Sequence, residues 1–180
     1  IGGRPFQKRQ YHRFFPVETV ETERILYAER LPAALAYARE NRLDRVEVGG
    51  ARDRLAVVSA GKSFADVRQA LLDLGLDDAA LAAAGIRLVK LGFIHPLDAD
   101  FAARSLRGVE EVVVVEEKRG FVEERIKEAL YPFADRPRVV GKRDERGVPL
   151  FPEHGGMDSD LVARLLGPRL LPLSGAAAPR

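Results

Sequence analysis

Four consecutive valines, Val112 to Val115, constrain the fold more than any other feature of this sequence. A continuous β-branched run is typical of a strand that is covered on both faces, because a half-buried strand alternates apolar and polar residues. Further strand-like apolar segments occur at Leu55–Val58, Ile86–Phe93 and Arg138–Val140. Amphipathic stretches separate these segments. Buried strands joined by helices predict a parallel sheet with helices on both faces.

The stretch after Ser63 has the clearest helical period. Phe64, Val67, Leu71 and Leu74 recur at helical spacing, and Gly75 is a suitable terminator. Ser63 is the expected N-cap, with an acidic residue three positions later as in a capping box. Further helices are expected at Pro32–Asn41, from Asp98 to Gly108, at Phe121–Tyr131, and around Leu161–Leu166, ended by Gly167-Pro168.

An antiparallel edge strand is expected at the start of the sheet. The strand-like segment Arg45–Gly49 is followed by a Gly-rich turn and then by Leu55–Val58. Two strands joined so tightly are expected to pair as a hairpin, because a parallel return needs a long crossover. The predicted fold is therefore a three-layer α/β/α sandwich, with a mostly parallel sheet and one antiparallel edge strand. It should occupy residues 31–167, between an irregular arm or inter-domain linker (1–30) and a flexible tail (168–180).

The composition excludes several classes of function. With no cysteine, the chain cannot hold a Cys-ligated iron–sulfur cluster, form a disulfide or use a thiolate nucleophile. The 29 basic and 27 acidic residues nearly balance, which argues against a nucleic-acid partner. No apolar run approaches the roughly 20 residues of a membrane helix, so a cytoplasmic protein without membrane contact is expected. The chain starts at Ile1, and its single Met is Met157, so we expect a part of a longer protein.

Gly61-Lys62-Ser63 follows a strand and opens a helix, as a phosphate-binding loop does. Such a loop needs another glycine five residues before Gly61, and this chain has Ala56 there. The segment is therefore interpreted as a tight strand-to-helix turn. The helix N-terminus could still attract one small anion, with Lys62 assisting.

Neither the histidines nor the carboxylates predict a catalytic or metal site. The three histidines are far apart in the sequence, and His95 precedes Pro96 at a strand end. Glu116 and Glu117 are adjacent in a strand, so they should point to opposite faces and cannot form an acid/base pair. They mark either a solvated exit from the core or, through Glu116, a buried acceptor at a domain contact. We assign no catalytic residue.

Several polar residues are expected at the edge of the sheet where the parallel strands end, which is where open α/β sheets bind ligands and partners. Whether they bind a ligand or contact another domain stays open at this point. The candidates are Gly61, Lys62, Ser63, His95, Pro96, Glu116, Glu117 and Lys118, with Lys142 and Arg143 at the same edge.

Two longer segments, Lys90-Leu-Gly-Phe-Ile-His-Pro-Leu-Asp98 and Val113-Val-Val-Glu-Glu-Lys-Arg119, resemble the 2-oxoacid:ferredoxin oxidoreductases. That family has a strand ending in K-x-G-x-x-x-P-L and, one helix later, a strand ending in V-V-E-E. Other stretches resemble the long, fused indolepyruvate ferredoxin oxidoreductases: Arg39–Arg45, Gly61–Leu71 and Pro137–Lys142. The resemblance covers roughly Leu31 to Leu166. Gly155–Ser159 departs from the family's G-E-L-T-P.

The resemblance implies a domain like the C-terminal domain of transketolase. It also implies a parent enzyme that oxidatively decarboxylates an aryl 2-oxoacid to the acyl-CoA, using thiamine diphosphate with Mg, [4Fe-4S] clusters, coenzyme A and ferredoxin. This chain lacks both cysteine and a Gly-Asp-Gly diphosphate motif, so we expect it to bind none of these cofactors. Its expected role is structural, with other domains or subunits of the parent enzyme as partners. The alternative is a freestanding α/β module that binds a small anion at the carboxyl edge of the sheet.

Overall fold

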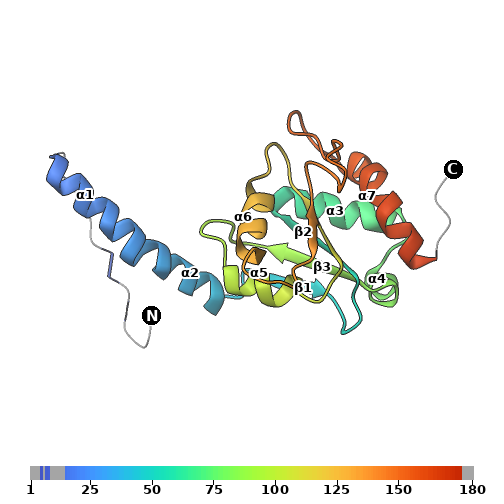
Figure 1. The fold of residues 1–180 in the computed structure, drawn as a ribbon, viewed down its shortest axis with the longest axis horizontal. Coiled ribbons are helices and arrows are strands. Elements are labelled where there is room, and N and C mark those ends of the chain that lie inside the picture. The colour runs from blue at the N-terminus through green and yellow to red at the C-terminus, as the bar shows by residue number, and fades with distance from the viewer. Residues whose placement is uncertain (1–4, 6, 9–14, 176–180) are drawn as a thin grey trace. The chain divides into compact units, whose positions relative to one another are not determined.

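The computed structural model describes residues 5, 7–8 and 15–175 and divides the chain into two compact units (Figure 1). We call Ile1–Leu43 the helical unit and Asp44–Arg180 the sheet unit. The boundary between them falls later than the predicted domain start at residue 31. Most of the predicted arm before Phe15 and the end of the predicted tail, residues 176–180, lie outside the described residues.

The helical unit corrects the prediction of an irregular arm up to residue 30. It contains α1 (Pro16–Ile25), the π-helical turn η1 (Leu26–Arg30) and α2 (Leu31–Glu40). The sequence lacks an apolar period here, but it is rich in good helix formers and has Pro16 at the first helical position. The π turn precedes Pro32, which has no N–H to donate, and the Leu31 N–H bonds five residues back to Leu26 O.

The sheet has the strand order β1-β3-β2-β4-β5. Its strands are β1 (Arg45–Val48), β2 (Leu55–Ala60), β3 (Ile86–Leu91), β4 (Glu111–Val115) and β5 (Arg138–Val140). Strand β1 lies antiparallel at one edge, and the other four run parallel. The predicted antiparallel edge strand is therefore confirmed.

The predicted hairpin partner of that edge strand is wrong. Strand β1 pairs with β3 rather than β2, so β3 lies between the two strands of the expected hairpin. The connection after β1 has to cross about 10 Å, two strand spacings, which a few extended residues can span. Asp53 anchors this connection: its carboxylate accepts from Gly50 N at 2.7 Å and from Arg87 Nε of β3 at 2.9 Å.

Helices cover both faces of the sheet, which confirms the three-layer α/β/α class (Figure 1). One face carries α3 (Gly61–Asp73), α4 (Asp78–Ala84) and α7 (Ser159–Ser174), and the other carries α5 (Ala99–Leu106) and α6 (Phe121–Leu130). Val113 and Val115 pack on the first side and Val112 and Val114 on the second. All four are at most 1% exposed, as the valine run predicts.

Two helix ends differ from the prediction. Helix α3 begins at Gly61, which has a φ of 54°, so Ser63 is its third residue and not its N-cap. Helix α7 continues through Gly167 and Pro168 to Ser174. The buried Leu170 and Leu171 lie beyond the proline, and their burial offsets the roughly 3 kcal/mol that an interior proline costs a helix. The predicted cap at Asp98 is confirmed, because its carboxylate accepts from Phe101 N at 3.0 Å.

Candidate functional site

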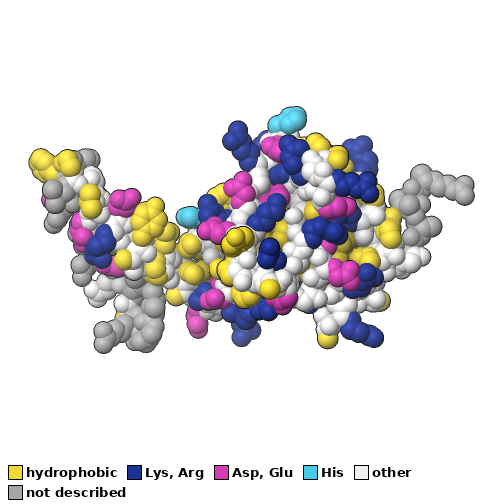
Figure 2. Space-filling view, in the orientation of Figure 1, with side chains coloured by type: hydrophobic (Ala, Val, Ile, Leu, Met, Phe, Trp, Pro, Cys, Tyr) yellow, Lys and Arg dark blue, Asp and Glu magenta, His cyan; other side chains and the backbone are white. Residues whose placement is uncertain are grey.

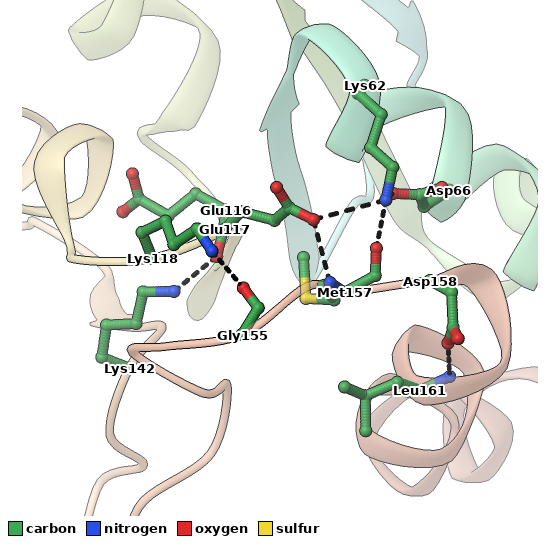
Figure 3. A network of polar contacts seen from close by, with 10 residues as sticks. All are labelled: Lys62, Asp66, Glu116, Glu117, Lys118, Lys142, Gly155, Met157, Asp158 and Leu161. Carbon is green, nitrogen blue, oxygen red and sulfur yellow. Dashed lines mark hydrogen bonds and ion pairs between the residues drawn. The ribbon is translucent and has the colours of Figure 1, made fainter.

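The loops at the carboxyl edge of the sheet bring three lysines and Glu117 to a single loop, residues 152–157, that precedes α7, and Glu116 lies beside them (Figure 3). Parallel strands end at the same edge, so residues far apart in the sequence meet there. Lys62 comes from the start of α3, Glu116 to Lys118 follow β4, and Lys142 follows β5. We call these contacts the edge network.

Glu116 caps helix α6. Its carboxylate accepts from Val122 N at 2.8 Å and from Glu123 N at 3.0 Å. Burial raises the pKa of Glu116, while the two backbone N–H groups oppose that rise. The N–H groups at a helix N-terminus are a favourable anion site, and here the chain supplies the anion itself. Glu116 is thus an acceptor within its own domain.

Glu117 has different partners from Glu116, although both lie in the loop after β4 and not in the strand, where they were predicted. It accepts from Met157 N at 2.8 Å and pairs with Lys62 Nζ at 3.3 Å. The Met157 N–H, and then the Lys62 ammonium, hold the pKa of Glu117 below its ordinary value. The two carboxylates are therefore committed separately, and they do not act as an acid/base pair.

Three lysines donate to backbone carbonyls of the 152–157 loop. Lys62 Nζ bonds Met157 O and lies 2.9 Å from the Asp66 carboxylate. Lys118 Nζ donates to Gly155 O at 2.5 Å (Figure 3), and Lys142 Nζ donates to Pro152 O at 3.1 Å. Lys142 also bonds Glu116 O, and burial lowers the pKa of its ammonium. These contacts fasten the loop to α3 and to the ends of β4 and β5.

A buried carboxylate that contacts the edge network, that of Glu123 on α6, was not predicted from the sequence. Only 5% of the residue is exposed, and it accepts from Lys142 N at 2.7 Å and from Lys127 Nζ at 2.5 Å. The site requires a glycine at Gly141, because an added Cβ there would lie 2.4 Å from Glu123 Oε2. The i, i+4 pair of Glu123 with Lys127 was a visible but ambiguous signal, since most such pairs are solvated.

A pocket of about 410 Å³ lies at the same edge, at the ends of β2 and β4. Of the predicted candidates, Ser63, Glu116, Glu117 and Lys118 line it, and the other lining residues are Ala60, Ile94, Arg119, Phe121 and Val122. Gly61, Lys62, His95 and Pro96 are not lining residues. The exposed His95 ring lies 6.2 Å from the Phe121 ring, centroid to centroid.

Within the described residues, no group of three or more His, Cys, Asp or Glu is arranged to hold a metal ion. In the same part of the chain, no helix is long and apolar enough to cross a membrane. On the face of the sheet unit drawn in Figure 2, Lys and Arg side chains are interspersed with Asp and Glu.

The donor set does not fit the cofactors that the family resemblance implies. An iron–sulfur cluster is held chiefly by cysteine thiolates, and the chain has no cysteine. The acidic side chains at the carboxyl edge already accept from backbone N–H groups and lysines. We therefore derive no chemical step through thiamine diphosphate or a cluster in this chain.

The fold and site define a class: an α/β sandwich domain whose polar edge groups mostly bind one another. More specifically, residues 45–178 match the indolepyruvate oxidoreductase domain family, and the chain belongs to this family. It is 32% identical over 124 residues to the indolepyruvate oxidoreductase subunit IorA of Methanothermobacter thermautotrophicus. It is 30% identical over 89 residues to the subunit of the same name from Thermococcus kodakarensis.

The first relative is matched over 67% of this chain but only 18% of its own length, and the second over 49% of this chain and 13% of its own length. The fold is also similar to a 2-oxoglutarate:ferredoxin oxidoreductase from Magnetococcus marinus, with a TM-score of 0.50 and 10% identity over 88% of this chain and 24% of that chain. A weaker likeness, with a TM-score of 0.45 and 22% identity, is to a split-gene transketolase described as an inactive β4 tetramer, over 72% of this chain and 42% of that chain.

Proposed function

We propose that this chain is an internal assembly domain of a cytoplasmic, thiamine-diphosphate- and iron–sulfur-dependent 2-oxoacid:ferredoxin oxidoreductase. Its parent protein would decarboxylate an aryl 2-oxoacid, most simply indolepyruvate, to the acyl-CoA and pass electrons to ferredoxin. The observation that carries the proposal is the family match over residues 45–178.

The state of the edge network supports a structural role. Lys62, Glu116 and Glu117 each bind a partner within the chain, so none of them is free to move a proton at a substrate. A catalytic constellation needs groups that converge on an unoccupied position. This part of the carboxyl edge instead holds a loop in place.

The helical unit offers apolar surface for contact with other domains. Phe15, Tyr27 and Tyr37 are 73%, 63% and 64% exposed. Interfaces are enriched in such aromatic residues relative to ordinary surface. Other domains or subunits of the parent enzyme are the partners that we propose for it.

The test compares the purified 180-residue chain with the full-length product of the gene from which it derives. We expect the full-length protein to reduce ferredoxin or a dye in the presence of indolepyruvate and coenzyme A, and to show iron–sulfur absorbance. The chain alone should do neither. Turnover by the chain alone would refute the assembly role. A full-length protein that reduces no acceptor with any aryl 2-oxoacid would refute the parent activity.

The assembly role is tested separately by deleting residues 45–175 from the full-length protein. We expect the truncated protein to lose its native oligomeric state, measured by sedimentation, together with its activity. The matched control is Gly156→Ala in the full-length protein, because a Cβ at this position meets nothing within 4 Å. If the truncated protein kept the native number of subunits and full activity, the proposal would be contradicted.

A further inference from the structure

The pocket at the carboxyl edge contains hydrogen-bond donors that the edge network does not use. Glu116, Glu117 and Lys118 also line it, but each is bonded to a backbone group of the chain. The remaining polar side chains are those of Ser63 and Arg119. A ligand that enters the pocket can form hydrogen bonds with these two side chains.

The Ser63 hydroxyl makes no hydrogen bond within the described part of the chain, and 7% of the residue is exposed. The oxygen of this hydroxyl is not among the buried side-chain atoms that lack a partner, so it stays open to solvent although most of the residue is covered. Because Ser63 lines the pocket, a ligand that enters the pocket can hydrogen-bond with this hydroxyl.

Arg119 is exposed, and its guanidinium has no hydrogen bond or ion pair among residues 15–175. A guanidinium carries donors only, in a planar fork that matches a carboxylate. Lys118 adds a positive charge beside it, since the Lys118 ammonium bonds the neutral carbonyl of Gly155. The polar groups of the pocket that have no partner within the chain therefore favour a negatively charged hydrogen-bond acceptor.

The two glutamates that line the pocket do not reverse this preference. The carboxylate of Glu116 is held by two backbone N–H groups, and that of Glu117 by one N–H and the Lys62 ammonium. The same arrangement disfavours phosphate. Phosphate sites use the N–H groups of a helix N-terminus, and Glu116 already fills the one at α6.

The rest of the wall is apolar and partly flat. Ile94 and Phe121 line the pocket and are 39% and 42% exposed. The Phe121 ring is backed by the tilted ring of His95. Exposed apolar side chains beside uncommitted donors suit a ligand that has a hydrocarbon body and an acidic end.

We propose that this pocket binds a small organic carboxylate with a planar apolar body. The carboxylate lies on the Arg119 fork and accepts from the Ser63 hydroxyl, and the body packs against Phe121 and Ile94. A volume of about 410 Å³ falls in the range of small-molecule sites. The inference goes beyond the assembly role and does not depend on it.

The test is a titration of the chain with benzoate, followed by two-dimensional amide NMR and calorimetry. Benzoate should shift the amides of Ser63, Ile94, Arg119 and Phe121 in a saturable way. Acetate, which lacks the ring, and benzyl alcohol, which lacks the charge, should each bind at least about tenfold more weakly. Arg119→Gln should weaken benzoate binding by about tenfold or more, as loss of a charge-assisted pair predicts.

Two further variants separate the contributions. Ser63→Ala should weaken benzoate and acetate alike, and Phe121→Ala should remove the preference for benzoate over acetate. The matched control is Arg164→Gln, an exposed arginine on α7 outside the pocket, which should leave binding unchanged. The proposal is overturned if benzoate causes no saturable shift up to about 20 mM, where a ligand with a Kd near 1 mM would saturate. It is overturned equally if acetate binds as well, or if Arg119→Gln binds as well as the wild type.

Discussion

Gly141→Ala should destabilise the sheet unit far more than a glycine-to-alanine change normally does. An added Cβ would lie 2.4 Å from Oε2 and 2.8 Å from Cδ of Glu123. Real Cβ atoms do not approach so closely, so the carboxylate must move. Glu123 is buried, however, and its movement breaks the bond from Lys142 N.

The cost follows from that broken bond. A buried N–H left without a partner costs about 1–3 kcal/mol, and more when the lost partner is charged. The Lys127 ammonium, half exposed, adds only a few tenths to about 1 kcal/mol. We expect a loss of about 2–4 kcal/mol in the free energy of unfolding. At about 2–4 °C per kcal/mol for a domain of this size, Tm should fall by about 4–16 °C.

The assay is urea and thermal unfolding of the purified chain, with a double-mutant cycle to identify the cause. In a Glu123→Ala background the carboxylate is absent, so Gly141→Ala should cost less than about 1 kcal/mol. The residual reflects the Val114 carbonyl, 3.2 Å from the added Cβ. Gly156→Ala is the neutral control. A wild-type-like Gly141→Ala, or simple additivity in the cycle, would refute the reasoning.

Three shorter predictions follow from other contacts. The hydrogen bond from Arg169 holds the pKa of Glu145 at about 2, below its ordinary 4.5, so this pair stabilises the fold above pH 4.5 and the effect is lost as pH falls toward 2. The urea midpoints of wild type and Glu145→Gln should therefore differ most near pH 6 and converge by about pH 2–3; a constant gap would contradict this. The Met157 N–H donates to the Glu117 carboxylate at 2.8 Å, so Glu117→Ala should speed hydrogen exchange at the Met157 amide. Unchanged protection of this amide would argue against the attachment of the loop. Leu166→Ala, at a fully buried position of α7, should cost about 2–5 kcal/mol in urea unfolding, and a loss below 1 kcal/mol would mean that α7 does not belong to the core.

Much of the fold could be predicted because strands that are buried on both faces have continuous apolar sequences, and helices that cover them have apolar residues at helical spacing. The valine run of β4 and the helical spacing after Ser63 placed a strand and a helix correctly. Strand pairing was harder. A short connection after β1 predicts that β1 pairs with β2, the next strand in the sequence. In the structure the connection passes β3 instead, and the ion pair of Asp53 with Arg87 of β3 holds it there. The run of α7 through Pro168 was likewise decided by packing and not by local preference.

The candidate site was predicted in location better than in detail. The rule that parallel strands end at one edge brought Lys62 and Glu117 together, and they do pair. The roles of Arg119 and Gly141 were missed. Arg119 stands out because no other side chain pairs with it, and Gly141 because it packs against a carboxylate from a distant element. Neither leaves a pattern along the chain.

The way in which the 152–157 loop is held has a consequence for how this domain can diverge. Lys62, Lys118 and Lys142 bind the loop through backbone carbonyls, and Glu117 binds it through a backbone N–H. Every residue type offers a backbone carbonyl, and every type except proline offers an N–H, so the attachment does not depend on the side chains of the loop. The exposed positions 153, 154 and 156 can therefore change in charge, size or chemistry while the path of the backbone is kept, whereas Gly155, with a φ of 75°, favours glycine. Related proteins could carry quite different residues on this loop and still present them in the same place, which makes it a permissive position for evolving a new contact.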